Sequence, residues 1–275
     1  MSPFDIAAEI VRTDDRDRYL ADLFAPEAVR RHLLALHAFN VEVARVREVV
    51  SDPNLGEIRL QFWQDGLQAE GAGHPVGQAL AETMATFRLP KVAFDNLIEA
   101  RRFDLYDDPM PSLNDLEGYA GETSSSLFQM AAIILAGGAD PGTADLSGHA
   151  GVAYALTGLI RALPIHAGRG QLYVPADVLD RHGVDRDTIF AGRNTPALRA
   201  AIGELAGVAR RHLDTAGTLA KGTPPALMPA FLPLALVGPD LDRMTRPAYE
   251  PFALAGMSKL RRQWILWRAA RRGMF

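Results

Sequence analysis

The sequence contains no cysteine. This excludes disulfide-stapled scaffolds, zinc sites built on thiolates and cysteine nucleophiles. An excess of charge of one sign is also missing, because 29 Lys and Arg face 33 Asp and Glu, for a formal net charge of −4. A protein that binds nucleic acid through bulk electrostatics needs a strong basic excess. We therefore expect no nucleic-acid partner.

Long apolar runs are missing as well. The run over 128–139 is too short to cross a bilayer, and the run over 227–237 is interrupted by Pro229 and Pro233. The first ten residues have neither the basic region nor the long apolar stretch of a secretory signal or transit peptide. These features predict a soluble, cytoplasmic protein.

Helical periodicity dominates what is present, and strand-type alternation is almost absent. A helix expected over 27–50 carries one stripe through Val29, Leu33, Leu36, Asn40, Val43, Arg47 and Val50. Further helices are expected over 55–70, 76–88, 90–107, 112–136, 143–163, 195–221, 224–237 and 247–272. Since we find no repeat and no linker, residues 1–275 are predicted to form a single all-α domain, a helical bundle.

Two of these helices carry unusual residues. Asn40 and Arg47 interrupt the apolar stripe of helix 27–50, so either that stripe faces a wet central cleft or the helix is rotated to expose both side chains. Helix 143–163 presents a row of small residues, which favours close helix packing over a ligand-lined groove. These residues are Ala144, Gly148, Gly151, Ala155 and Gly158.

Common catalytic signatures are absent, including His-Glu-x-x-His, Gly-x-Ser-x-Gly and the P-loop. Asp104, Asp107 and Asp108 are the minimum for a Mg²⁺ site near a helix end, although a solvated acidic end is the simpler interpretation. Glu122, close to Ser125, is the best remaining polar group. It could act as a general base, or the cluster could form a buried hydrogen bond between helices.

The C-terminal segment is basic. Residues 257–275 contain Lys and Arg but no Asp or Glu, and Met257, Leu260, Trp264 and Trp267 form an apolar stripe on the helix expected over 247–272. A basic amphipathic helix with tryptophans can lie on a membrane surface. The alternative is that the stripe packs on the body of the domain.

Several stretches together resemble the squalene/phytoene synthase family of head-to-head prenyl transferases. They are Arg59-Leu60-Gln61-Phe62-Trp63-Gln64, Asp104-Leu105 with Leu116-Glu117-x-Tyr119, and Arg169-Gly170-Gln171-Leu172-Tyr173-Val174-Pro175. The resemblance implies an isoprenoid-synthase helical bundle. It also implies that active members hold diphosphates through Mg²⁺ bridged by two acidic motifs, Asp-Asp-x-x-Asp and Asp-x-x-Glu-Asp.

Those two motifs are not present in this chain. Aligned without gaps, the first becomes Ala44-Arg45-Val46-Arg47-Glu48 and the second becomes Ala162-Leu163-Pro164-Ile165-His166. One carboxylate survives, and two arginines make Mg²⁺ capture electrostatically unfavourable. Pro164 should also kink or end its helix. We therefore expect that the prenyl-transfer chemistry has been lost, with no catalytic residues and no metal ligands.

A second resemblance is to the complex I assembly factor 6 branch, which has the same fold without the acidic motifs. It is carried by Ala38-Phe39-Asn40-Val41-Glu42, Gln61-Phe62-Trp63, Tyr119-Ala120-x-Glu122-Thr123-x-Ser125-Ser126-Leu127, Arg161-Ala162-x-Pro164-x-His166 and Pro229-Ala230-Phe231-Leu232. This resemblance implies a membrane-peripheral helper in building respiratory complex I. Here that role would be in the cytoplasm, at the inner membrane.

The leading hypothesis is thus a pseudoenzyme that binds a client protein of a respiratory complex, or an isoprenoid-like lipid, in the former substrate cavity. The candidate cavity residues are Asn40, Arg45, Arg47, Glu48, Arg161, His166, Arg169 and Tyr173. No cofactor is expected under this hypothesis. The competing hypothesis is an active Mg²⁺-dependent prenyl transferase that uses Glu48 with Asp104, Asp107 and Asp108.

Overall fold

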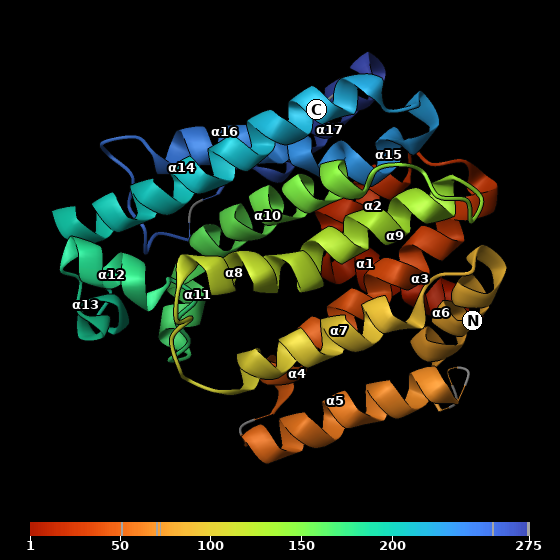
Figure 1. Ribbon diagram of the computed structural model, residues 1–275, viewed down its shortest axis with the longest axis horizontal. Coiled ribbons are helices and arrows are strands. Elements are labelled where there is room, and N and C mark those ends of the chain that lie inside the picture. Colours follow the sequence, from red (N-terminus) through yellow and green to blue (C-terminus); the bar gives the residue numbers. More distant parts are fainter. Residues whose placement is uncertain (51, 70, 72, 255, 274–275) are drawn as a thin grey trace.

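The computed structural model describes residues 1–50, 52–69, 71, 73–254 and 256–273. Every regular element within these residues is a helix, which confirms the predicted all-α class (Figure 1). None of these helices is both long enough and apolar enough to cross a bilayer.

The N-terminal part contains α1 (Pro3–Asp14), α2 (Arg16–Asp22), α3 (Glu27–Ala44), α4 (Val46–Val49), α5 (Pro53–Gln68), α6 (Pro75–Phe87), α7 (Lys91–Arg101) and the 3₁₀ helix η1 (Arg102–Leu105). The middle contains α8 (Leu113–Ala120), the π-helical turn η2 (Gly121–Ser125), α9 (Ser126–Leu135), α10 (Ala144–Arg161), α11 (Leu163–Gly168), α12 (Ala176–His182) and α13 (Arg186–Phe190). The C-terminal part contains α14 (Pro196–Leu219), η3 (Ala220–Gly222), η4 (Pro225–Leu227), α15 (Met228–Phe231), η5 (Leu232–Leu236), α16 (Val237–Met244) and α17 (Lys259–Arg272).

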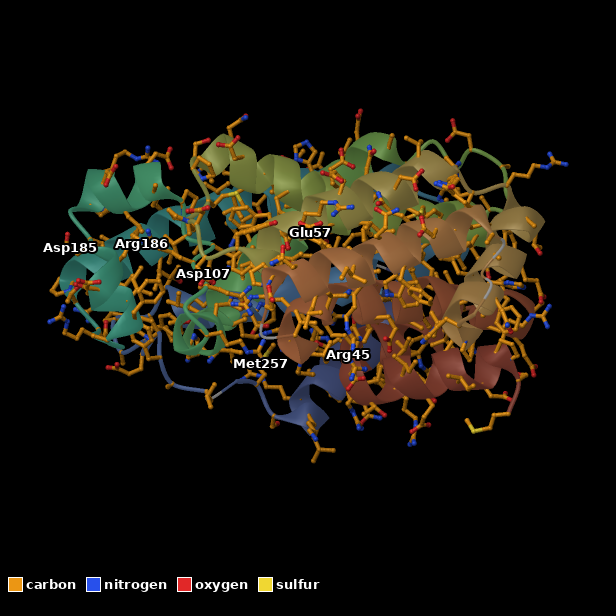
Figure 2. All side chains as sticks on the ribbon, turned by 90° about the horizontal axis from the view of Figure 1, so that it is seen from below. Arg45, Glu57, Asp107, Asp185, Arg186 and Met257 are labelled. Atoms are coloured by element: carbon orange, nitrogen blue, oxygen red, sulfur yellow. The ribbon has the colours of Figure 1, made fainter. Side chains whose placement is uncertain are left out.

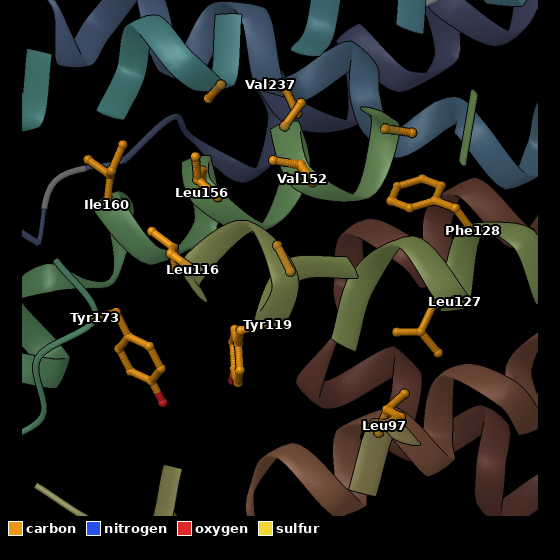
Figure 3. Packing of buried hydrophobic residues seen from close by; sticks show 14 of the residues in the cluster. Leu97, Leu116, Tyr119, Leu127, Phe128, Val152, Leu156, Ile160, Tyr173 and Val237 are labelled. Atoms are coloured by element: carbon orange, nitrogen blue, oxygen red, sulfur yellow. The ribbon is translucent and has the colours of Figure 1, made fainter. Parts of the chain in front are cut away.

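Helix α10 runs through the middle of the bundle, between α14 on one side and α8 and α9 on the other (Figure 1). Helix α3 packs on α1, α6 and α9, and α5 lies at the edge against α7. The main cluster of buried apolar residues extends from Ala7 in α1 to Tyr249 beyond α16. Figure 3 shows its central part, where Leu116, Phe128 and Leu156 come from three different helices.

The small-residue row on α10 serves close packing at one point. A Cβ atom on Gly151 would overlap the backbone of Ser125 in η2, so the two segments touch without an intervening side chain. The Ser125 hydroxyl also donates a 2.9 Å hydrogen bond to the Gly148 carbonyl. The other end of the row differs, because Ala155 and Gly158 line a cavity. The row thus allows close packing at Gly151 and borders a cavity at Ala155 and Gly158.

Several predicted helices are shorter than expected. The helix over 27–50 breaks at Arg45 into α3 and α4, and the helix over 112–136 contains the π-helical turn η2. The helix over 224–237 is a chain of short 3₁₀ and α segments, since Pro225, Pro229 and Pro233 each remove a backbone donor. Helices α1, α2, α11, α12, α13 and α16 lie outside the predicted ranges, apart from the boundary residues Leu163 and Val237.

The predicted start of the C-terminal helix is wrong. The helix begins at Lys259 rather than near 247, because the residues around Pro247 and Pro251 form turns. Its buried side chains are Leu266 and Ala269, which pack on α2 and η5 in a second, smaller apolar cluster.

The apolar stripe expected on that helix is not the buried one. Leu260, Trp264 and Trp267 are 79%, 54% and 47% exposed. Met257 alone of the stripe is partly buried against the smaller cluster. The alternative in which this stripe packs on the domain is therefore wrong for its three helical residues, even though the helix itself is packed.

Candidate functional site

A cavity of about 490 Å³ opens beside the end of α3. It is lined by Asp14, Asp15, Asn40, Val41, Ala44, Arg45, Glu48, Val49 and Arg169. Four of the predicted site residues, Asn40, Arg45, Glu48 and Arg169, thus come together here. Figure 2 views this face of the molecule and labels Arg45. We call this cavity the mouth.

The charged groups at the mouth are already paired with one another. Arg169 donates a 2.8 Å hydrogen bond from Nη1 to Oε1 of Glu48. Arg45 lies 3.3 Å from Glu42 and 3.8 Å from Asp14. The side chains of Arg45 and Arg169 are 43% and 40% exposed, so water and an incoming ligand can reach both guanidinium groups.

A second cavity of about 220 Å³ shares Asn40 with the mouth and is lined by buried and half-buried residues. Its lining is Arg18, Asn40, Arg101, Tyr119, Thr123, Ser124, Tyr154, Ala155, Gly158, Leu159, Ala162 and His166. We call it the inner cavity. Asn40 is 6% exposed, which supports the interpretation that the α3 stripe faces a central cleft at this point.

Two buried polar atoms on this lining lack a hydrogen-bond partner among the described residues. They are Oδ1 of Asn40 and Oγ of Ser124. A buried polar group without a partner costs about 1–3 kcal/mol. Ordered water or a ligand that reached either atom would recover this free energy.

Asp104 is the centre of a buried hydrogen-bond network with Arg101, Tyr119 and Tyr173, which we call the knot. Its Oδ1 accepts hydrogen bonds from the hydroxyls of Tyr119, at 2.8 Å, and Tyr173, at 2.7 Å. Its Oδ2 accepts from Arg101 at 3.1 Å. Figure 3 shows Tyr119 and Tyr173 entering this space from α8 and from the segment after α11. The predicted site residue Tyr173 is therefore a hydrogen-bond donor to Asp104.

The two hydroxyls and the guanidinium group of the knot each keep a single protonation state at neutral pH. Burial raises the pKa of the Tyr119 and Tyr173 hydroxyls above their ordinary value, so both remain donors at neutral pH. Burial opposes the charge on Arg101, but Tyr119 and Asp104 outweigh it and raise the pKa of the guanidinium. These are the features of a structural ion pair rather than of an acid–base catalyst.

His166 connects the polar and apolar parts of the site. It lines the inner cavity and also a tight apolar pocket formed with Leu116, Leu156 and Ile202. Its ring lies 4.6 Å from the Tyr173 ring, centroid to centroid. Burial lowers the pKa of His166 to about 4, so the imidazole is neutral at physiological pH.

The remaining predicted arginines lie away from the inner cavity. Arg47 is 3.2 Å from Asp107, which Figure 2 labels on the same face as Arg45. Arg161 lies in a neighbouring cavity of about 360 Å³ and is 3.1 Å from Asp240. Asp240 is 1% exposed and also accepts from Arg262 of α17.

Sequence reasoning missed Asp240, because its partners lie 79 and 22 residues away along the chain. It also missed Arg18, which pairs with Asp15 at 2.7 Å and stacks over the Tyr154 ring at 4.7 Å. The Asp-Asp-Arg-Asp-Arg run over 14–18 was the available signal.

The carboxylates of the Mg²⁺ hypothesis do not converge. Glu48 pairs with Arg169, Asp104 with Arg101, and Asp107 with Arg47. Among the described residues no three His, Asp or Glu side chains are placed to hold a metal ion. The donor set in this arrangement does not fit a Mg²⁺ site.

The two segments aligned with the family's acidic motifs also have a backbone that does not suit a Mg²⁺ site. Helix α3 ends at Ala44, so Arg45 interrupts the first segment. Helix α10 ends at Arg161, and α11 starts at Leu163 with Pro164 in its first turn, as the proline predicts.

A model of the squalene/phytoene synthase family matches residues 11–268. The chain is 30% identical to human NADH dehydrogenase (ubiquinone) complex I, assembly factor 6, over 89% of this chain and 74% of the human protein. It is 27% identical to the phytoene synthase of Thermus thermophilus, over 73% of this chain and 69% of that enzyme.

The fold has solved counterparts. The crystal structure of squalene synthase HpnC from Alicyclobacillus acidocaldarius matches with a TM-score of 0.71 and 24% identity, covering 99% of this chain and 95% of that one. The similarity in fold to a squalene synthase agrees with the match of the family model to most of the chain. The chain belongs to the squalene/phytoene synthase family.

Proposed function

We propose that this chain is a catalytically degenerate member of its family that acts as a binding or assembly factor in the biogenesis of respiratory complex I. Support comes from its similarity to complex I assembly factor 6 of human and, at 31% identity, to the Drosophila melanogaster homolog. The proposed location is the cytoplasm, at the inner membrane.

One observation carries this proposal. Glu48 is the only carboxylate in the two segments aligned with the acidic motifs, and Arg169 binds it at 2.8 Å. A diphosphate leaving group needs several hard oxygen ligands that share metal ions. A carboxylate whose charge is compensated by a guanidinium cannot supply that set alone.

The proposed ligand site is the mouth together with the inner cavity. Arg45 and Arg169 would exchange their present partners, Asp14 and Glu48, for an anionic group on the ligand, because exposed guanidinium groups bind carboxylate and phosphate bidentately. Asn40 supplies a free hydrogen-bonding atom deeper in. The ligand is a segment of a client protein of a respiratory complex or an isoprenoid-like lipid.

Gene deletion with complementation tests the role. We expect the deletion strain to accumulate less assembled complex I, measured on native gels and as membrane NADH:quinone activity, and wild-type protein to restore it. Arg169→Glu should fail to restore it, because it reverses the charge beside Glu48. Arg193→Glu is the matched control, since Arg193 is exposed and lines none of the cavities described above. Normal complex I in the deletion strain would overturn the proposal.

The second candidate is an active Mg²⁺-dependent transferase that condenses two prenyl diphosphates head to head. Its supporting observation is the 27% identity to a phytoene synthase. It requires Glu48, Asp104 and Asp107 to leave their arginine partners. Turnover of labelled prenyl diphosphate by the purified protein separates the two candidates.

A further inference from the structure

The outer face of α17 combines exposed aromatic side chains with exposed cations. Leu260, Trp264 and Trp267 are spaced at i, i+4 and i+7, so they form one stripe along the helix. The buried residues Leu266 and Ala269 lie on the opposite side and hold the helix on the bundle. The stripe therefore lies on the solvent side of the helix.

The exposure is costly unless something covers it. Trp is normally buried over most of its surface, and adjacent exposed apolar groups of this size mark an interaction site. The three side chains are between 47% and 79% exposed. Helix α17 itself is well anchored, because Ser258 caps its first turn and Arg262 reaches in to Asp17 and Asp240.

Charge indicates what covers the stripe. No Asp or Glu follows Glu250 in the sequence. The exposed cations of α17 are Lys259, Arg261, Arg268, Arg271 and Arg272. No ion pair joins any of them to a carboxylate of the described residues. The face is thus strongly positive as well as apolar.

The aromatic and cationic groups are also arranged together. The Arg268 guanidinium lies 5.3 Å from the centre of the Trp264 ring, and that of Arg271 lies 5.0 Å from the centre of the Trp267 ring. Tryptophan prefers the boundary between acyl chains and headgroups, and arginine beside it can reach the lipid phosphates.

We propose that the outer face of α17 binds the surface of an anionic membrane, with the helix axis parallel to the bilayer plane. Trp264 and Trp267 enter the headgroup boundary, and the flanking arginines contact anionic lipid phosphates. The complementary charge favours a lipid surface over an apolar protein groove. The inference does not depend on the ligand of the inner cavity.

Flotation of the full-length protein with vesicles tests this. We expect the protein to float with phosphatidylcholine vesicles that contain phosphatidylglycerol, to bind pure phosphatidylcholine much more weakly, and to be released by salt. Trp264→Ser/Trp267→Ser should lower the partition coefficient by about tenfold or more. Phe62→Ser on α5 is the matched control, because Phe62 is an aromatic residue that is 45% exposed on another helix.

A charge variant separates the two parts of the interaction. Arg268→Gln/Arg271→Gln should reduce binding to the anionic vesicles by roughly tenfold or more and flatten its salt dependence. Thermal unfolding shows that each variant is folded. Wild-type protein that does not float with anionic vesicles, or a tryptophan variant that floats equally well, would overturn the proposal. So would a protein partner that binds this face while vesicles do not.

Discussion

Arg169 and Glu48 meet at 2.8 Å although 121 residues separate them in the sequence. Glu48 belongs to α4, just past the break at Arg45, and Arg169 follows α11. The pair lines the mouth with a guanidinium–carboxylate contact at a point where a metal-dependent synthase would need free carboxylates. Since both side chains are about half exposed, the pair contributes little stability, and its importance is for the chemistry of the cavity.

The knot around Asp104 predicts a large effect on stability. Asp104→Asn keeps the shape of the side chain and an Oδ1 acceptor for Tyr119 and Tyr173. It removes the charge that faces Arg101 and replaces the Oδ2 that accepts from Arg101 by an NH₂ group. We expect the free energy of unfolding to fall by about 3 kcal/mol, because a buried guanidinium is left without its counterion.

Urea denaturation followed by circular dichroism measures this change. Asp108→Asn is the control, since Asp108 is exposed and four residues further along the chain. We expect it to leave the free energy of unfolding within about 0.5 kcal/mol of wild type. Equal effects of the two substitutions would show that the knot does not stabilise the fold.

The contact between α10 and η2 predicts opposite effects of the same substitution at neighbouring glycines. Gly151→Ala should destabilise the protein by about 1–3 kcal/mol, because the new methyl group overlaps the backbone of Ser125. Gly148→Ala should be neutral or stabilise by up to about 1 kcal/mol, since nothing lies within 4 Å of its Cβ position and alanine favours the helix. Thermal melts of both variants decide this, and stabilisation by Gly151→Ala would contradict the close approach.

His166 predicts a dependence of stability on pH. Burial lowers its pKa in the folded protein from 6.5 to about 4. Between these values the unfolded chain takes up a proton that the folded chain does not, so the free energy of unfolding falls as pH is lowered through this window. Above pH 6.5 the imidazole is mostly neutral in both the folded and the unfolded chain, so His166 no longer lowers the free energy of unfolding.

Comparison with His166→Phe isolates this contribution from the other titrating groups. From pH 7.5 to 4.5 the wild type should lose more free energy of unfolding than the variant, by at most about 3 kcal/mol. Phenylalanine keeps an aromatic ring against Tyr173, so packing changes little. Parallel pH profiles of the two proteins would show that His166 is not buried in its neutral form.

Helical periodicity was sufficient to predict most of the bundle. α5, α6 and α14 begin and end within a few residues of the expected positions, because each starts at a proline and carries a continuous apolar face. Periodicity shows which residues share a face, but it does not show which face is buried. On α17 the stripe of Trp264 and Trp267 is exposed, and the helix is buried through Leu266 instead.

The candidate site was predictable only in part. Asn40 and Arg169, both named as candidates from the sequence, line the mouth. The partners of the arginines could not be found in the same way. Asp240 lies 79 residues from Arg161, and its burial results from the packing of α16 beside α10 and α17 beside α2. Such pairings depend on tertiary structure and leave no local pattern.

The proposed loss of prenyl transfer is tested most directly by a turnover measurement. Purified protein is incubated with labelled farnesyl or geranylgeranyl diphosphate and Mg²⁺ or Mn²⁺, with and without NADPH, beside Glu48→Gln as the control. The paired carboxylates of Glu48, Asp104 and Asp107 predict no condensed product above that control. Product formed by the wild type and lost in Glu48→Gln would contradict the account and identify an active synthase.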